Sequence, residues 1–362
     1  MMKRRSSKFT DSLRIAAVCL AMIALLSPVN GVAQQQESKA TGKASASGSP
    51  AAGTSAANAA PLNVADWLLR MHEATKRRAY VGTYVVSANG NLASAKVWYV
   101  CDGTQQMERV ESLSGTPKAT FRHNERVITF LPASKVARSE NRSSLGLFPN
   151  LLHSSGSRVD DFYVATRSGQ ERVAGVDAEI VILQPKDQWR YGYRIWAESA
   201  SGLVVKLQTV DARGQILEQV AFSELQLDAP VKMERLSQMM ANTEGYRVER
   251  IDPVKTSAQA EGWGMRRIVD GFTPMGCYRR PSATAQVGSV VETVQWIFSD
   301  GLASVSLFIE PFDRQRHVRE VVTVAGATHS HSRRLQDWWV TAVGEVPEPT
   351  LQAFMENLMR TR

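Results

Sequence analysis

The sequence has few cysteines and none of the spacings that would make them functional. Three cysteines occur in 362 residues, and Cys19 lies within an apolar N-terminal run. The other two, Cys101 and Cys277, can form at most one disulfide, and spacing does not decide whether they do. A small domain held together by disulfides is therefore excluded, and Cys101, which follows the strand-like VWYV, is expected to be a buried thiol.

Common catalytic signatures are also missing. The chain contains no Gly-x-Ser-x-Gly, His-Glu-x-x-His, Cys-x-x-Cys, Walker or Gly-x-Gly-x-x-Gly motif. His329 and His331 stand two residues apart, so on a strand both could reach one ion, but two ligands do not close a tetrahedral site. The run ATHSHSRR is better explained as an exposed hairpin end. We predict no catalytic residue, metal or cofactor, although a triad assembled from distant residues stays open.

The excess of positive charge is small. The first 33 residues hold five basic side chains and one acidic side chain, a net +4, which leaves +4 of the +8 for the rest of the chain. This is too little for a nucleic-acid-binding surface. Locally, arginine pairs such as Arg279-Arg280 gather in the C-terminal third, where they form either a solvated face or a surface for an acidic peptide or anionic headgroup.

No apolar run is long enough to be a clear membrane span. The run from Ile15 to Val29 follows a basic start and is interrupted by Pro28, whereas a span needs roughly 20 residues. Gly31-Val32-Ala33 fits a signal-peptidase site, so residues 1–33 are predicted to be a secretory signal cleaved after Ala33. A membrane anchor is the rival interpretation. Residues 34–61 are rich in Ala, Ser and Gly and are predicted to be a disordered lead.

Periodicity predicts two structured domains of class α+β. A helix capped by Asn63 should come first, followed over residues 62–228 by short strands and turns typical of a large, curved antiparallel sheet with packed helices. Residues 229–250 are predicted to be a linker that includes a helix. A smaller domain of antiparallel sheet and helix should occupy residues 251–362, ending in a helix after Pro347. Its apolar stripe is Leu351, Phe354, Met355, Leu358 and Met359.

The smaller domain contains a predicted hairpin, VQWIFSDGLASVSLFIEP at residues 294–311. Asp300-Gly301 suits the turn, and alternate apolar residues give each strand a buried face. The opposite face is also partly apolar, through Ile297, Leu302 and Phe308. Either this domain covers the hairpin on both sides, or a partner covers part of it.

Several segments together resemble one known family. They are YVGTYVVS, DGTQQMERVESLSG, RYGYRIWAE, GLVVKLQTVDARGQILEQVAFSEL, SDGLASVSLFIEP and VTAVGEVPEPTL. From about Ala65 to the C-terminus the chain is similar to the RseB/MucB family of periplasmic sigma-E factor regulatory proteins. The resemblance implies a large half-barrel like that of the lipoprotein carriers LolA and LolB, joined to a smaller C-terminal domain, and no enzymatic activity.

The resemblance also implies a function. Family members bind the periplasmic part of a membrane-spanning anti-sigma factor and shield it from proteolysis, and a lipopolysaccharide or lipoprotein ligand is thought to release the shield. For this chain we predict a partner-binding surface in the smaller domain, formed by Arg279, Arg280, Trp296, Phe298 and Phe308. Core packing is the competing fate of each aromatic residue.

A lipid cavity is predicted beside the first helix, at Trp67, Leu68 and Met71. A lipid or lipoprotein carrier is the alternative function, but carriers of this fold work as single domains. An enzyme comes third. Neither a nucleic-acid partner nor a cofactor is expected, and a homo-oligomer is left open.

Overall fold

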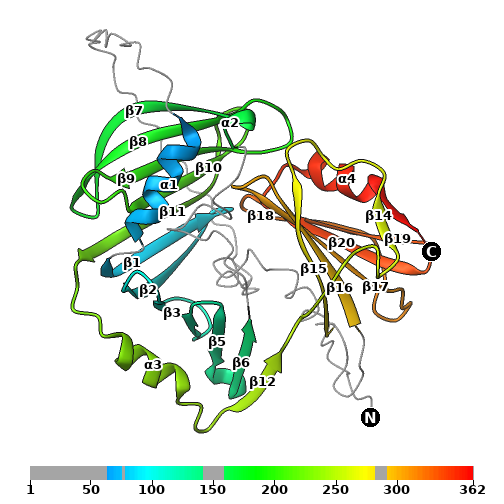
Figure 1. Ribbon diagram of the computed structural model, residues 1–362, viewed down its shortest axis with the longest axis horizontal. Coiled ribbons are helices and arrows are strands. Elements are labelled where there is room, and N and C mark those ends of the chain that lie inside the picture. The colour runs from blue at the N-terminus through cyan, green and yellow to red at the C-terminus, as the bar shows by residue number, and fades with distance from the viewer. Residues whose placement is uncertain (1–62, 76–77, 142–158, 282–291, 362) are drawn as a thin grey trace, which may run out of the picture.

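The computed structural model describes residues 63–75, 78–141, 159–281 and 292–361. The predicted signal peptide, its cleavage site and the predicted lead at 34–61 lie outside these residues. Figure 1 shows two sheets side by side, the larger built from the first two thirds of the described chain. No helix in these ranges is long and apolar enough to cross a membrane.

The large sheet has twelve strands in the order β12-β6-β5-β4-β3-β2-β1-β11-β10-β9-β8-β7. All neighbours are antiparallel except β12 and β6, which pair in parallel. Its strands are β1 (Ala79–Ala88), β2 (Asn91–Cys101), β3 (Gln106–Ser112), β4 (Ala119–His123), β5 (Arg126–Leu131), β6 (Val136–Asn141), β7 (Tyr163–Val173), β8 (Val176–Pro185), β9 (Gly192–Glu198), β10 (Val204–Val210), β11 (Ile216–Leu227) and β12 (Arg247–Ile251). A short 3₁₀ helix, η2 (Pro132–Ser134), joins β5 to β6.

Helix α1 (Val64–Thr75) packs on one face of this sheet. As predicted, Asn63 caps it, because its side-chain oxygen accepts a hydrogen bond from the Asp66 amide at 2.9 Å. The buried stripe of α1 contacts a core that includes Tyr80 and Phe222. The short helix α2 (Val159–Phe162) holds the start of α1, since Asp160 accepts a hydrogen bond from the Val64 amide at 2.8 Å.

Residues 229–250, which were predicted to be a linker, contain a helix and a strand that pack on or pair with the large sheet. Helix α3 (Met233–Ala241) buries Leu236 and Met240 in a second core with Phe121 and Phe130. Alternate residues of β2 contact the two cores, so α3 lies on the face opposite α1. The following strand, β12, extends the edge of the sheet at β6. The chain therefore passes to the small sheet only after Ile251.

The small sheet has seven strands in the order β13-β15-β16-β17-β20-β19-β18. They are β13 (Val254–Thr256), β15 (Thr273–Pro281), β16 (Glu292–Ser299), β17 (Ser304–Pro311), β18 (Val321–Ala325), β19 (Thr328–Leu335) and β20 (Trp338–Gly344). Helix α4 (Glu348–Asn357) covers one face, and Leu351, Phe354 and Met355 are buried there. A separate two-stranded sheet pairs β14 (Trp263–Met265) with β21 (Leu358–Arg360).

The α+β class and the two antiparallel sheets with packed helices are confirmed, with two corrections. The last helix is shorter than predicted, because the chain leaves it at Asn357 and Leu358 lies in β21. Cys101 and Cys277 are free thiols. Cys277 is buried, and burial raises its pKa to about 11. Cys101, which was predicted to be a buried thiol, is only half-buried.

Candidate partner-binding surface and interdomain junction

The five residues predicted to bind a partner do not form one patch. In β15, Arg279 and Arg280 are consecutive, so their side chains lie on opposite faces of the small sheet. Trp296 and Phe298 are on the Arg279 face, whereas Phe308 pairs with Gln295 on the Arg280 face. Strand alternation therefore divides the predicted surface in two.

On the α4 face the aromatic residues belong mainly to the core. Phe298 has no exposed surface and lies 4.9 Å from the ring of Phe354 and 4.7 Å from that of Trp296. Trp296 is half-buried and packs against the same cluster. Of these two rings, only part of Trp296 is available to a partner.

Arg279, at the margin of that face, is exposed but engaged by two carboxylates. Its guanidinium lies 2.8 Å from Glu261 and 3.4 Å from Glu292, and the hydrogen bond that Arg279 donates to Glu261 raises the pKa of Arg279. Partial burial works against ionisation of Glu261, yet hydrogen bonds from Arg279 and Thr256 hold the pKa of Glu261 below its usual value. The charge of Arg279 is therefore largely balanced by its neighbours.

The opposite face carries polar side chains joined in a network. Arg280 donates to the Gln295 side chain at 2.9 Å, and Gln295 donates to Ser306 at 3.4 Å. Further along, Ser332 and Thr341 are linked at 2.9 Å. Phe308 is a half-buried ring on this polar surface. Gln295 and Ser306 are buried, so this network stabilises the sheet and holds Arg280 in place beside Phe308.

The tip of the predicted hairpin meets the large sheet, which answers the question posed by its two apolar faces. Leu302 packs against the core of the large sheet, while Ala303 belongs to the core under α4. Asp300 shapes the turn by accepting hydrogen bonds from the amides of Leu302 and Ala303 at 2.9 and 2.7 Å. The cover for this part of the hairpin is thus the other domain of the same chain.

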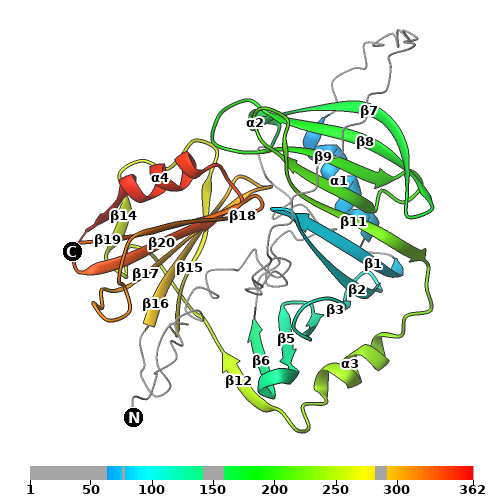
Figure 2. The ribbon, with the colours of Figure 1, turned by 180° about the vertical axis from the view of Figure 1, so that it is seen from behind.

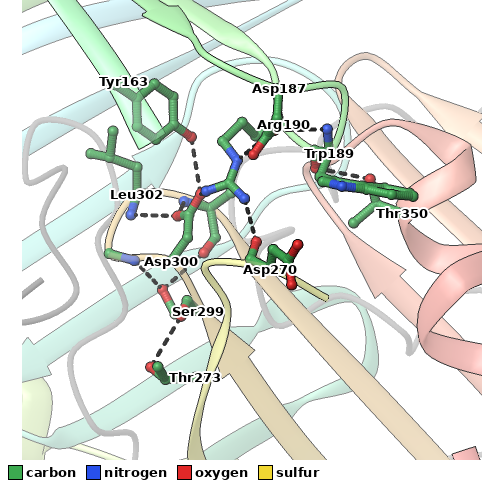
Figure 3. A network of polar contacts seen from close by, with 12 residues as sticks. Tyr163, Asp187, Trp189, Arg190, Asp270, Thr273, Ser299, Asp300, Leu302 and Thr350 are labelled. Carbon is green, nitrogen blue, oxygen red and sulfur yellow. Dashed lines mark hydrogen bonds and ion pairs between the residues drawn. The ribbon is translucent and has the colours of Figure 1, made fainter. Parts of the chain in front are cut away.

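Figure 3 shows the polar network around this tip. Arg190, from the segment between β8 and β9, lies 3.1 Å from Asp300, and neither side chain is exposed. Arg190 also contacts Asp187 at 3.0 Å and donates to the carbonyl oxygen of Asp270 at 2.6 Å. Tyr163 donates a hydrogen bond at 3.1 Å to the same carboxylate oxygen, Oδ2 of Asp300, that Arg190 contacts. Two sheets are thereby joined through one buried guanidinium.

Aromatic rings and a glycine complete the pocket of Arg190. Its guanidinium lies 4.5 Å from the ring centre of Phe162 and 5.3 Å from that of Phe272. Gly271 has φ +88°, and a Cβ there would stand 2.7 Å from the Arg190 side chain. Burial raises the pKa of Asp300, while Arg190 and the turn amides oppose that rise. Burial likewise raises the pKa of Tyr163.

More contacts join the two sheets on either side of this ion pair. Thr350 of α4 donates to the carbonyl of Trp189 at 2.8 Å, and Tyr191 lies 3.3 Å from Nδ1 of His329. Beside β18, the Ala327 amide reaches Glu218 of the large sheet at 3.5 Å. His329 therefore has a structural role at the junction, and within the described residues no three His, Cys, Asp or Glu side chains gather as a metal site.

The predicted lipid-cavity residues are together, but they are packed. Trp67, Leu68 and Met71 are all buried on one side of α1. Tyr80, Tyr84 and Val97 belong to the same cluster, as does Tyr163 of the junction. In this conformation these three side chains of α1 are packed into the core of the large sheet.

Sequence reasoning missed Arg190 and Tyr163. Asp300 was interpreted only as a turn residue, and its partners lie 110 and 137 positions away. No local spacing connects residues that far apart. A buried arginine could have been suspected only from its aromatic neighbours in the segment WRYGYRIW.

Two sheets with separate cores, joined at a buried ion pair, define a two-domain protein. Comparison with known proteins gives the family. Residues 63–240 match the MucB/RseB N-terminal domain and residues 257–359 match the MucB/RseB C-terminal domain. The chain belongs to the MucB/RseB family of sigma-factor regulatory proteins, a regulatory and non-enzymatic family.

Individual relatives agree with this assignment. The chain is 30% identical over 299 residues to the sigma factor AlgU regulatory protein MucB of Pseudomonas aeruginosa, covering 80% of this chain and 89% of that protein. It is 20% identical to the sigma-E factor regulatory protein RseB of Haemophilus influenzae, covering 84% and 94%. The crystal structure of MucB in complex with MucA(peri) superposes with a TM-score of 0.63 at 25% identity, covering 83% of this chain and 100% of that chain.

Proposed function

We propose that this chain is exported to the periplasm, where it binds the periplasmic part of a membrane-spanning anti-sigma factor and shields it from proteolysis. The observation that carries the proposal is the likeness to the MucB chain solved with MucA(peri), which extends over the full length of that chain. Both family domains are present here in the same order. The partner-binding surface is assigned to the small domain.

The two halves of the predicted surface make separable contributions to this binding. Arg280 and Phe308 are partly exposed on either side of the buried Gln295, so a charged group and an aromatic ring are the groups that a partner could contact on this face. Arg279, at the margin of the other face, has its charge balanced by Glu261 and Glu292. We assign an acidic flank of the partner to the surface formed by these arginines of β15.

Charge reversal tests this assignment. Arg280→Glu is expected to slow association with the periplasmic domain of the anti-sigma factor and to change its salt dependence, because facing charges act mainly on the encounter rate. The double variant with Arg279→Glu should do so at least as strongly. A matched control is the exposed pair Arg266→Glu, Arg267→Glu, which has the same change in net charge. Equal kinetics for both double variants at low and high salt would refute the assignment.

A lipidic or lipoprotein signal is proposed to release the partner. Trp67, Leu68 and Met71 share one core with Tyr163, and Tyr163 holds Asp300 across the junction. An acyl chain that displaces the α1 stripe would therefore act on a residue that joins the two sheets. Release requires the ligand to prefer the unbound conformation, and a tenfold effect needs about 1.4 kcal/mol of preference.

Titration of the preformed complex with a diacyl lipopeptide tests the release. Dissociation should rise with lipopeptide concentration, and Tyr163→Phe should reduce that dependence because it removes the hydrogen bond to Asp300. Lipopeptide binding with unchanged partner affinity would contradict the sensor and favour a lipid or lipoprotein carrier. If the lipopeptide does not bind, the chain would still be able to shield its partner, but this signal would not release it.

A further inference from the structure

The four edges of the twelve-stranded and seven-stranded sheets differ in how they are protected. Sheet edges attract other strands unless bulges, charges or short length prevent it. At the large sheet, β7 has a bulge between Arg167 and Gly169, and β12 has the charged sequence RVERI. At the small sheet, β13 has three residues, one of them Lys255. Only β18, with the sequence VVTVA, has none of these protections.

The apolar side chains of β18 are exposed. Val322 and Val324 expose 44% and 52% of their surface, and Val318 in the preceding segment exposes 68%. Val322 and Val324 are two residues apart, so they lie on the same face of the strand. β-Branched side chains in this position suit contact with a neighbouring strand.

The backbone geometry of β18 shows which groups point outward. Its pairing with β19 ends at Ala325 opposite Thr328, which encloses a two-residue turn. Such a turn is closed by a hydrogen-bonded pair, and the alternation of an antiparallel ladder then directs the N–H and C=O groups of Val322 and Val324 away from β19. Consistent with this, the Val324 carbonyl accepts a hydrogen bond from Asn89 of the large sheet at 3.4 Å.

That contact fixes one end of the edge and leaves the other end accessible. Figures 1 and 2 show β18 as the strand of the small sheet that lies toward the large sheet. Toward Val322, no hydrogen bond within the described part of the chain joins the outward backbone groups to another element. An incoming strand could use the N–H and C=O of Val322 and the N–H of Val324.

The segment before β18 is mainly basic, and its exposed acid, Glu320, accepts a hydrogen bond from the Arg334 amide. Arg314 and Arg319 are exposed in the segment that leads into β18, and neither has an ion-pair partner among the residues the structure describes. A strand with acidic residues at one end would complement them. A second copy of this chain would bring the same arginines to the contact, and a membrane surface would leave the outward backbone groups unpaired.

We propose that β18 accepts an extended segment of the anti-sigma factor's periplasmic part as an eighth strand of the small sheet. The segment has alternating apolar residues, which contact Val322 and Val324, and an acidic flank near Arg314 and Arg319. This inference rests on the proposed function. The added strand would be a second contact, separate from the one proposed at the Arg280 face of the same sheet. The partner segment would be recognised mainly through its backbone.

Amide hydrogen exchange of the full chain, free and bound to the periplasmic domain of the anti-sigma factor from the same organism, tests the inference directly. Binding should slow exchange of the Val322 and Val324 amides at least tenfold. Val322→Pro removes the outward N–H without touching the ladder to β19, and it should weaken binding at least tenfold. Val322→Thr keeps the N–H and the β-branched shape and should bind within about threefold of the wild type.

The outcomes separate this inference from the proposed function. Binding by the wild type with no protection of these amides and unchanged affinity of Val322→Pro overturns the strand addition alone. No binding by the wild type overturns the proposed function as well. If Val322→Pro does not fold, amide protection in the wild type decides. Protection that appears without the partner at high protein concentration, or only with phosphatidylglycerol vesicles, assigns the edge to a second copy or a membrane and overturns the inference.

Discussion

Arg190 and Asp300 form an ion pair that joins the two sheets and is closed to solvent. The guanidinium Nη1 and the carboxylate Oδ2 are 3.1 Å apart, and both side chains have zero exposed surface. Arg190 comes from the segment before β9, and Asp300 comes from the tip of the β16–β17 hairpin. The relative position of the two domains therefore depends on this contact. If one partner is lost, the charge of the other stays buried in a low-dielectric interior without a counter-ion.

Replacing Arg190 with methionine should destabilise the protein strongly. Arg190→Met keeps much of the packing against Phe162 and Phe272 but leaves the Asp300 carboxylate without its cation. Breaking one side of a buried pair costs about 3–5 kcal/mol. The exposed pair Arg267–Asp270 supplies the control, Arg267→Met, with an expected cost of about 0–1 kcal/mol. Denaturant unfolding compares the two variants, and equal losses would contradict a structural role for Arg190.

Phe298 and Phe308 should separate stability from binding. Phe298 is fully enclosed between Trp296 and Phe354, so Phe298→Ala should cost about 3–5 kcal/mol of unfolding free energy. Phe308→Ala removes a half-buried ring and should cost less. Urea unfolding measures both costs, and surface plasmon resonance with the anti-sigma periplasmic domain measures binding by the folded fraction. Unchanged binding for Phe308→Ala would remove that residue from the proposed surface.

Glu345 should make the junction sensitive to pH. Burial and the nearby Glu218 carboxylate raise the pKa of Glu345 to about 8, and burial also raises the pKa of Glu218. Tyr193 is the other titratable group that the charge of Glu345 reaches. Because the folded state favours the protonated acid, this contribution to stability is full below the unfolded pKa of about 4.3 and is lost as pH rises through about 8.

Glu345→Gln tests this dependence. The variant should gain melting temperature relative to the wild type as pH increases from 5 to 9, because the amide never ionises. Glu348→Gln, an exposed acid three residues further on, is the control and should show no such trend. Parallel melting curves for Glu345→Gln and the wild type over this pH range would rule out the effect.

Local features of the fold were predictable because they depend on neighbouring residues. Asn63 marked the start of α1, and Asp300-Gly301 marked the hairpin turn, where Gly301 has φ +103°. The parallel pairing of β12 with β6 was not predictable, since it brings Arg247 beside Val136 across more than a hundred residues. Residues 229–250 therefore resembled a linker in the sequence.

The grouping of the predicted partner-binding residues went wrong for a different reason. Arg279 and Arg280 were grouped because they are consecutive, although in a strand consecutive side chains lie on opposite faces. The alternation was present in the sequence, so this division could have been foreseen. The Arg190–Asp300 contact could not, because it depends on how two complete domains meet.

The shielding function is tested most directly by calorimetric titration of the full chain with the periplasmic domain of the anti-sigma factor from the same organism. We expect saturable binding with a dissociation constant of about 1 μM or tighter, equivalent to about −8 kcal/mol. The bound periplasmic domain should also resist the protease that cleaves it when free. Absence of binding at protein concentrations far above that value, or binding that leaves cleavage unchanged, would contradict a shielding function.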